Sequence, residues 1–301
     1  LDGNDDDPFI ALDATENFLD AELMEFLEGD SEWWVDGKIG QSVNFSSEKK
    51  QFAIIEGYEN TSNALTISAW VWAGSAEPWG SVLKNWGDAQ SGQFHFGLNA
   101  SGNQLSNFIS TTKGKAFSVT EEDSFPLESW QHVATTVDGL KIKLYRNGQL
   151  VAETSYEGIL MEDVVPSIGI AAKLNDDGSW TSQGSGGYWN GKMDDIGLWG
   201  RSLTHAEIMG IYQSGLTGND LSKAIAVEIQ PPADVSLELS LITSDEIRLS
   251  WHDESSQYTL QQSDDLKKWN AINIDVDNFN NKKEVRLSKN EKQMFFRLMA
   301  E

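Results

Sequence analysis

The sequence contains no cysteine, which excludes disulfide bonds and thiolate metal sites. Basic residues are few, because 22 Lys and Arg stand against 47 Asp and Glu, for a net charge of −25. Nucleic acid is therefore not an expected partner, since phosphate backbones are bound mainly by basic side chains. The same charge disfavours anionic membrane surfaces and favours the capture of divalent cations.

Long apolar runs and catalytic motifs are also missing. No run of about 18 apolar residues occurs, so we expect no membrane span. The sequence has no G-x-S-x-G motif, P-loop or dinucleotide-binding fingerprint, and its four scattered histidines argue against a zinc site. The chain starts at Leu1 rather than at methionine, so we expect a processed product or internal fragment whose signal peptide lay upstream.

What the sequence does contain is a series of short β-rich segments separated by Gly, Asn and Asp. Residues 64–74 alternate strictly, with Leu65, Ile67, Ala69 and Val71 on one face and Thr66, Ser68, Trp70 and Trp72 on the other. Residues 129–139 and 140–153 predict a hairpin, with Asp138-Gly139 and Asn147-Gly148 as turn signals. Strands at this spacing are typical of a sandwich or jelly roll, so we predict an all-β fold.

Two segments carry helix signals. Apolar residues recur near helical spacing in residues 14–29, which predicts a short helix there. The better signal follows the last strand of the series, where Thr204 can cap a helix, Glu207 can complete a capping box and Gly215 can end it.

The residue pattern changes after this second predicted helix. Pro231-Pro232 indicates a linker or a stiff entry to a new domain. We therefore expect a first domain over residues 1–222, a linker over 223–232 and a small β-sandwich over 233–301.

Three motifs occur in order in the first domain: W-x-H-V-A at 130–134, L-Y-x-N-G at 144–148 and D-D-x-x-L-W-x-R-x-L-T-x-x-E-I at 194–208. From Val43 to Gly215 the chain resembles the LamG-like (concanavalin A-like) jelly-roll domains of secreted bacterial proteins. This resemblance implies a jelly-roll sandwich, a secreted or cell-surface location and often a bound calcium ion.

The C-terminal part carries a second, less specific resemblance. Residues 247–272 and the terminal F-F-R-L are similar to a small fibronectin-type-III-like β-sandwich. Such modules occur on secreted proteins of marine planctomycete and verrucomicrobia-type bacteria. The whole chain is thus expected to be a concanavalin A-like jelly roll followed by a smaller β-sandwich.

Asp194 and Asp195 are adjacent on a predicted strand, so their side chains should point to opposite faces and should not share a substrate. The Glu-x-Asp-x-x-Glu pattern of glycosidases built on this jelly roll is absent. The family resemblance places its more constant aspartate at Asp194, a possible Ca²⁺ ligand together with loop oxygens. The alternative is that Asp194 only accepts hydrogen bonds from backbone amides.

Residues 173–191 form a Gly- and Ser-rich loop, which predicts an exposed, adaptable segment. A sugar ring could stack on its aromatic residues while neighbouring polar side chains bind the hydroxyl groups. The candidate ligand-binding residues of this loop are Asn175, Asp176, Asp177, Trp180 and Tyr188. The alternative is that the loop folds back and Trp180 fills its own base.

A second candidate rim lies in residues 75–93, where Trp79 and Trp86 could flank a groove. The alternative for Trp86 is packing as an edge-strand residue. His132 and several strand tryptophans are expected to be structural, namely Trp70, Trp130, Trp199, Trp251 and Trp269.

These features favour a non-catalytic extracellular module that binds a polysaccharide or other glycan, with a structural calcium ion. A fold alone does not fix a function, so two alternatives remain. One is a protein-interaction or adhesion module that binds a cell-surface protein. The other is a glycoside-active enzyme, which the missing catalytic carboxylate pattern disfavours.

Overall fold

The computed structural model describes the chain apart from residues 1–2, 4–5, 16, 28–32, 60–62, 88–91, 163, 180–185, 222–236, 244–245, 253–257, 264–269, 273–276, 280–281, 289–293 and 301. It divides into two compact units, Leu1–Val227 and Glu228–Glu301. The predicted linker 223–232 lies outside the described residues. Within the described part, no helix is both long and apolar enough to cross a bilayer.

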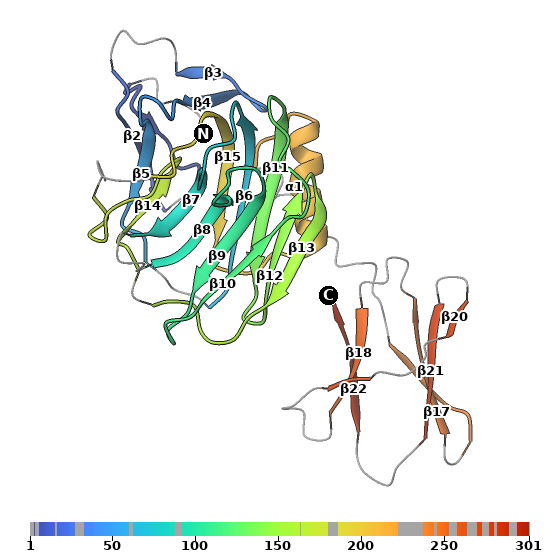
Figure 1. The fold of residues 1–301 in the computed structure, drawn as a ribbon. Helices are drawn as coiled ribbons and strands as arrows, with labels where there is room; N and C mark the ends of the chain where they lie inside the picture. Colours follow the sequence, from blue (N-terminus) through green and yellow to red (C-terminus); the bar gives the residue numbers. More distant parts are fainter. Residues whose placement is uncertain are drawn as a thin grey trace. The chain divides into compact units, whose positions relative to one another are not determined.

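The first unit is a sandwich of two antiparallel sheets (Figure 1). The eight-stranded sheet has the order β1 (Ile10–Ala11), β2 (Ala21–Met24), β5 (Phe52–Glu56), β14 (Ser167–Ile170), β7 (Ser81–Trp86), β8 (Gly92–Leu98), β9 (Leu105–Ser110), β10 (Ala116–Thr120). The seven-stranded sheet has the order β13 (Gln149–Ser155), β12 (Lys141–Arg146), β11 (Trp130–Val137), β6 (Leu65–Ala73), β15 (Gly191–Trp199), β4 (Gln41–Phe45), β3 (Trp34–Asp36). The predicted all-β sandwich is therefore confirmed.

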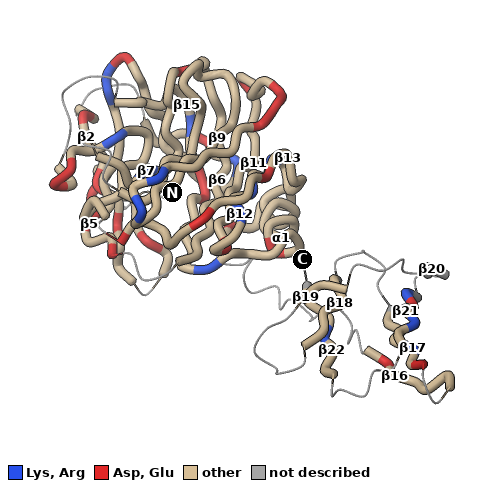
Figure 2. Tube along the Cα trace, turned by 60° about the horizontal axis from the view of Figure 1, so that its bottom comes forward, with Lys and Arg blue, Asp and Glu red and all other residues tan. Residues whose placement is uncertain are grey.

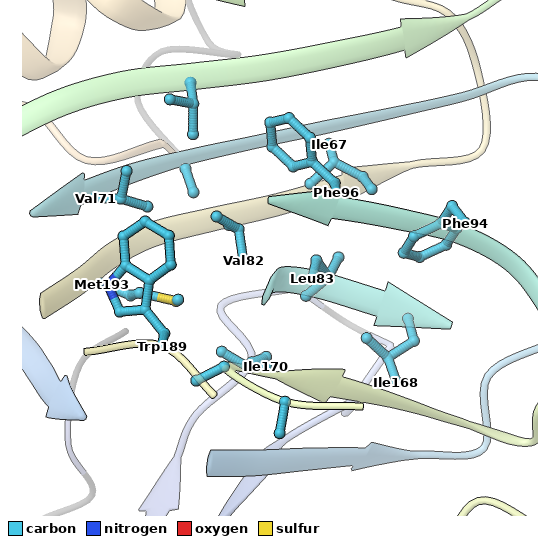
Figure 3. Close-up of a cluster of buried hydrophobic side chains, with 14 of the residues drawn as sticks. Ile67, Val71, Val82, Leu83, Phe94, Phe96, Ile168, Ile170, Trp189 and Met193 are labelled. Atoms are coloured by element: carbon cyan, nitrogen blue, oxygen red, sulfur yellow. The ribbon is translucent and has the colours of Figure 1, made fainter. Parts of the chain in front are cut away.

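The two sheets share one hydrophobic core, to which β6 contributes the four apolar residues predicted for one of its faces. Figure 3 shows Val71 of β6 near Met193 of β15, with Val82 of β7 and the indole of Trp189 in the same cluster. Trp189 lies at the end of the predicted binding loop, so one aromatic of that loop belongs to the core.

The predicted hairpin is present as β11, β12 and β13. Asn147 and Gly148 both have positive φ, 52° and 77°, as the tight turn between β12 and β13 requires. His132 on β11 is fully buried and its Nε2 lies 2.8 Å from Ser68 Oγ, which confirms that it is structural.

Helix α1 (His205–Leu216) covers the outer face of the seven-stranded sheet (Figure 1). Its predicted capping box is present, because Thr204 Oγ1 accepts from Glu207 N and Glu207 Oε2 accepts from Thr204 N. The helix runs past Gly215, where a side chain would collide with the Trp70 indole, and the left-handed glycine after its end is Gly218.

The helix predicted over 14–29 is wrong, because part of this segment is strand β2, paired with β1 and β5. Burial along β2 alternates with the period of a strand, with Ala21 and Leu23 buried. Before it, Asp13 and Thr15 bind nearby backbone amides with their side chains, which competes with helix formation.

The second unit contains two small sheets, as expected for a smaller β-sandwich. One has the order β16 (Glu238–Leu241), β17 (Glu246–His252), β21 (Lys282–Ser288), β20 (Asp277–Phe279), and the other β19 (Asn270–Ala271), β18 (Tyr258–Ser263), β22 (Phe295–Ala300). Leu249, Trp251, Leu260 and Val285 lie in its core. Its fibronectin-type-III likeness stays a prediction, and Trp269 lies outside the described residues.

Candidate functional site

One row of paired residues crosses the outer face of the eight-stranded sheet, the face turned away from the shared core. Ser118 on β10 pairs with Phe108, which pairs with His95, which pairs with Lys84 on β7. Their side chains share a face because paired residues of neighbouring strands point the same way. Phe94 and Phe96, on either side of His95, belong to the core. The row thus brings aromatic and ionisable groups together on one surface.

Trp79, from the predicted rim before β7, packs on this row. The centroid of its ring lies 5.3 Å from that of Phe108 and 5.7 Å from that of His95. Trp79 is half-buried and has a φ of 60°, an uncommon conformation for a bulky residue. Its amide donates to Asn99 O at 2.9 Å, and its carbonyl accepts from Ser81 Oγ. The surrounding chain therefore holds this indole in a strained backbone conformation, a feature that clusters at functional sites.

Phe108 was missed in the sequence analysis. Its signal was the alternation in β9, where Leu105 and Ile109 face the core and Phe108 therefore points outward. Because Phe108 is half-buried and next to Trp79, the two rings form an aromatic platform on the outer face. We call Trp79 and Phe108 the outer-face platform.

The two predicted rims meet along β7. At one end Ser81 N donates to Gly187 O at 2.8 Å, and at the other end the Asp176 side chain lies so close to Gly87 that a Cβ there would collide with it. The loop that follows β14 therefore runs back along the edge of the site. Trp86 is half-buried at the end of β7, next to Gly87.

The tip of this loop is a turn built by its own polar groups. Asp177 Oδ1 accepts from both the amide and the hydroxyl of Ser179, and these hydrogen bonds hold the pKa of Asp177 below its usual value. Asn175 donates from Nδ2 to Ser179 Oγ at 3.1 Å, and Asp176 and Asp177 are exposed. Trp180 lies outside the described residues. The turn thus presents two carboxylates beside the Trp86 end of β7.

Tyr188 lies at the base of the loop. It is partly buried and packs edge-on against Phe52 of the core, with ring centroids 6.3 Å apart. This contact places Tyr188 against the core cluster, whereas Asp176 and Asp177 lie in the exposed turn.

Lys84 and His95 form a buried base beneath the site. Lys84 is 7% exposed, and no hydrogen bond or ion pair reaches its amine from the residues that the structure describes. Burial, together with repulsion by Lys173, lowers the pKa of Lys84 to about 7. Burial, with repulsion by Lys84, lowers the pKa of His95 well below its usual value. At neutral pH His95 is therefore uncharged and Lys84 is only partly protonated, so this base carries less charge than two exposed basic residues would.

Asp194 and Asp195 bind different parts of the chain. Asp194 is 1% exposed and its Oδ2 accepts from Ile39 N at 2.8 Å, whereas Asp195 Oδ2 accepts from Leu221 N at 3.0 Å. Burial, with repulsion by Asp194, raises the pKa of Asp195 to about 6. The predicted separation of these two carboxylates is confirmed.

The described residues form no cluster of His, Cys, Asp or Glu side chains that would hold a cation at Asp194 by itself. Among these residues, no group of three or more His, Cys, Asp or Glu could hold a metal ion. Figure 2 shows Asp and Glu spread over the first unit. The residues around Asp194 thus offer one buried carboxylate, and backbone carbonyl oxygens or water would have to complete a calcium site.

Comparisons with known proteins place this geometry in context. The chain is 30% identical over 125 residues to an alpha-L-arabinofuranosidase of Bifidobacterium longum, a match covering 39% of this chain and 11% of that protein. The chain thus spans only about a tenth of that relative.

Solved structures show weaker likeness. Domain 4 of an extracellular arabinanase from Geobacillus stearothermophilus, solved with arabinotriose, is 16% identical, with a TM-score of 0.43 and coverage of 63% of this chain and 86% of that one. The binding domain of Paraclostridial Mosquitocidal Protein 1 is 17% identical, with a TM-score of 0.47 and coverage of 60% and 45%.

The family comparison covers more than half of the chain. The model of the concanavalin A-like lectin/glucanases superfamily matches residues 47–209, which include the outer-face platform, the strands from β5 to β15 and the start of α1. The chain belongs to the concanavalin A-like lectin/glucanases superfamily.

Proposed function

We propose that the first unit is an extracellular, non-catalytic module that binds neutral glycan chains on the outer face of its eight-stranded sheet. The observation that carries this proposal is the outer-face platform, in which a strained backbone holds Trp79 against Phe108 and His95. Aromatic rings offer apolar faces to the C–H groups of a sugar ring. The base beneath them holds a neutral His95 and a partly protonated Lys84, with no carboxylate in the row, and we propose a neutral sugar as the ligand.

The polar partners for sugar hydroxyls come from the loop beside β7. Asp176 and Asp177 are exposed, and carboxylates accept hydrogen bonds from hydroxyl groups. We assign Asn175 and Trp86 to the same rim and Tyr188 to its base, and we propose from the sequence that Trp180 also contacts the sugar. Arabinose-containing polymers are the first glycans to test, because the matched relative acts on arabinofuranosides by its name.

The absence of catalysis is part of this proposal. Hydrolysis of a glycoside needs two carboxyl groups facing one cleft. The carboxylates of Asp194 and Asp195 instead bind two separate segments of the chain, at Ile39 and Leu221. We expect no release of sugar from any glycan that the module binds.

Calcium also remains a proposal. Asp194 is the residue that would bind the ion, and the ion would brace the chain around Ile39 rather than touch the sugar. The proposal is supported by the acidic composition, with a net charge of −25, and by the preference of Ca²⁺ for oxygen ligands.

Titration calorimetry with soluble arabinan and other neutral polysaccharides tests the platform. Trp79→Ala should weaken binding by at least about tenfold, since one aromatic stack supplies roughly that factor. Leu127→Ala is the matched control, because Leu127 is exposed and lies outside the platform. Equal binding by both variants would contradict the proposed site.

A further inference from the structure

A second aromatic feature lies on the N-terminal loop before β2. Phe18 is 82% exposed, more than any other large hydrophobic residue described, and has a φ of 56°. A bulky residue with a positive φ is an outlier, and such outliers cluster at functional sites. The surroundings of Phe18 are therefore a place to look for a ligand site.

The loop that presents Phe18 is fixed by hydrogen bonds. The carboxylate of Asp13 accepts from the amides of Thr15 and Leu19 and from the Thr15 hydroxyl, at 2.7–3.0 Å. The amide of Asp13 donates to Asp20 Oδ1 at 2.7 Å, which closes the loop on itself. These hydrogen bonds restrain the described residues on either side of Phe18, which lowers the entropy cost of ordering this segment when a ligand binds.

A groove of about 340 Å³ opens beside this loop, at the end of the sandwich where β5 and β15 end and β6 begins. The lining residues used here are Asn17, Leu19, Tyr58, Glu59, Gln93 and Trp199. Asn17 and Leu19 flank Phe18 in sequence, so the Phe18 backbone lies at the rim, although Phe18 itself is not among the lining residues. No residue of the outer-face platform lines this groove.

The wall of the groove is rigid on the side of Tyr58. Its hydroxyl donates to Gln93 Oε1 at 2.6 Å, and its ring packs edge-on against Phe94 with centroids 6.2 Å apart. Next to it, Gly57 has a φ of 77° and open space where a side chain would stand. A preformed wall with free space in front of it is what a small-molecule site requires.

The chemistry of the lining indicates the class of ligand. Tyr58 and Trp199 contribute aromatic rings, and Asn17 and Glu59 contribute an amide and a carboxylate that can bind hydroxyl groups. Gln93 is 1% exposed and its side chain already bonds to Tyr58 and Met161, so it supports the wall rather than the ligand. The volume is at the lower end of the range of about 300–1,000 Å³ for ligand sites. Glu59 is the one charged residue in the lining, and the chain is strongly acidic, so an anionic sugar is disfavoured.

We propose that this groove is a second saccharide site, for neutral or amino-sugar units, with Phe18 as a stacking surface on its rim. The module then has two separate sites and can hold one branched chain or two neighbouring chains. The inference takes its ligand class from the proposed function but uses none of the same residues. Two sites on one module raise the avidity for a polymer above that of either site.

Protein-observed NMR with short probes tests the groove separately from the outer face. The probes are tetrasaccharides of arabinose, xylose and glucose, and a glucosamine tetramer. The reporters for the groove are the Trp199 indole and the amides of Leu19 and Gly57, and the reporter for the outer face is the Trp79 indole. We expect at least one probe to shift the groove reporters saturably.

Phe18→Ser should weaken the response at the groove by about tenfold and leave the Trp79 response unchanged. It should also leave the melting temperature unchanged, since Phe18 is exposed. Leu140→Ser is the matched control, because Leu140 is 72% exposed and lies in the turn between β11 and β12, outside the groove lining. Glu59→Gln should weaken the groove response further in the Phe18→Ser background.

Two outcomes would overturn the inference. If the NMR signal of the Trp79 indole shifts while the groove signals stay unchanged with every probe, the groove binds no sugar. The outer-face proposal then stands. If the groove reporters shift only on dilution of the protein, a second copy of the chain occupies the groove. Shifts at the groove without any at Trp79 would support the inference and contradict the outer-face proposal.

Discussion

The indole of Trp79 packs against the imidazole of His95, with 5.7 Å between the ring centroids. This contact joins the loop before β7 to the centre of the eight-stranded sheet, and it depends on a positive φ at Trp79. Glycine adopts such a conformation without strain, whereas alanine does not. Trp79→Gly should therefore be more stable than Trp79→Ala by about 1 kcal/mol, while neither variant binds glycan. Urea unfolding of both variants measures this difference, and equal stabilities would show that the backbone there is not strained.

Asp195 should destabilise the folded chain at neutral pH. Its pKa is about 6 in the folded state against an ordinary 3.8. Between these two pH values the folded state therefore holds a proton that the unfolded state has lost. Stability therefore falls as pH rises from 3.8 through 6. Asp195→Asn keeps an acceptor for Leu221 N and suits the φ of 45° at this position.

We expect Asp195→Asn to be about 1–2 kcal/mol more stable than the wild type at pH 7.5 and no more stable at pH 3.5. Denaturant unfolding at the two pH values measures this. A gain of the same size at both would mean that it does not come from ionisation of Asp195.

Lys84 should destabilise the folded chain at low pH, whereas Asp195 does so at high pH. Its pKa of about 7 in the folded state lies below the ordinary 10.5, so between these values the unfolded state holds the extra proton. Stability then rises with pH across this window, and the penalty of burying the charge is fully present below about pH 7.

Lys84→Met removes this penalty and keeps an unbranched side chain of similar length. We expect it to gain about 1–3 kcal/mol at pH 6.5, and less at pH 9.5. Lys141→Met is a control, since Lys141 forms an exposed ion pair with Glu153. A loss of stability at both pH values would mean that the Lys84 amine has a stabilising partner.

Asp194 offers a test of calcium. Asp194→Ala leaves the amide of the half-buried Ile39 without its acceptor, which should cost about 1–3 kcal/mol. If calcium binds at Asp194, adding the ion should raise the melting temperature of the wild type but not that of the variant. A variant that keeps the wild-type response to calcium and chelator would place the ion elsewhere.

Local signals predicted much of the fold. The core face of β6, the Asn147-Gly148 turn and the Thr204–Glu207 capping box depend on residues close in sequence, and the structure has all three. The helix predicted over residues 14–29 was wrong because the apolar spacing there fits a helix and a strand equally well. The Asp13 side chain favours the non-helical conformation by accepting hydrogen bonds from the amides of Thr15 and Leu19.

The site was less predictable, because it depends on long-range register. Trp79 could be singled out from its loop, but its contact with Phe108 follows from the pairing of β8 with β9. The row from Ser118 to Lys84 joins four strands, and no single segment carries that alignment. The groove beside Phe18 likewise combines residues from the N-terminal loop, β8 and β15.

The most direct test of glycan binding is affinity electrophoresis of the whole chain through gels containing arabinan and other plant and marine polysaccharides, in calcium and in chelator. We predict retardation by at least one neutral polysaccharide, and its loss in Trp79→Ala. Retardation that persists in chelator would show that calcium does not bridge the module to the sugar. Free migration in every gel would contradict the account and favour a protein partner for this module.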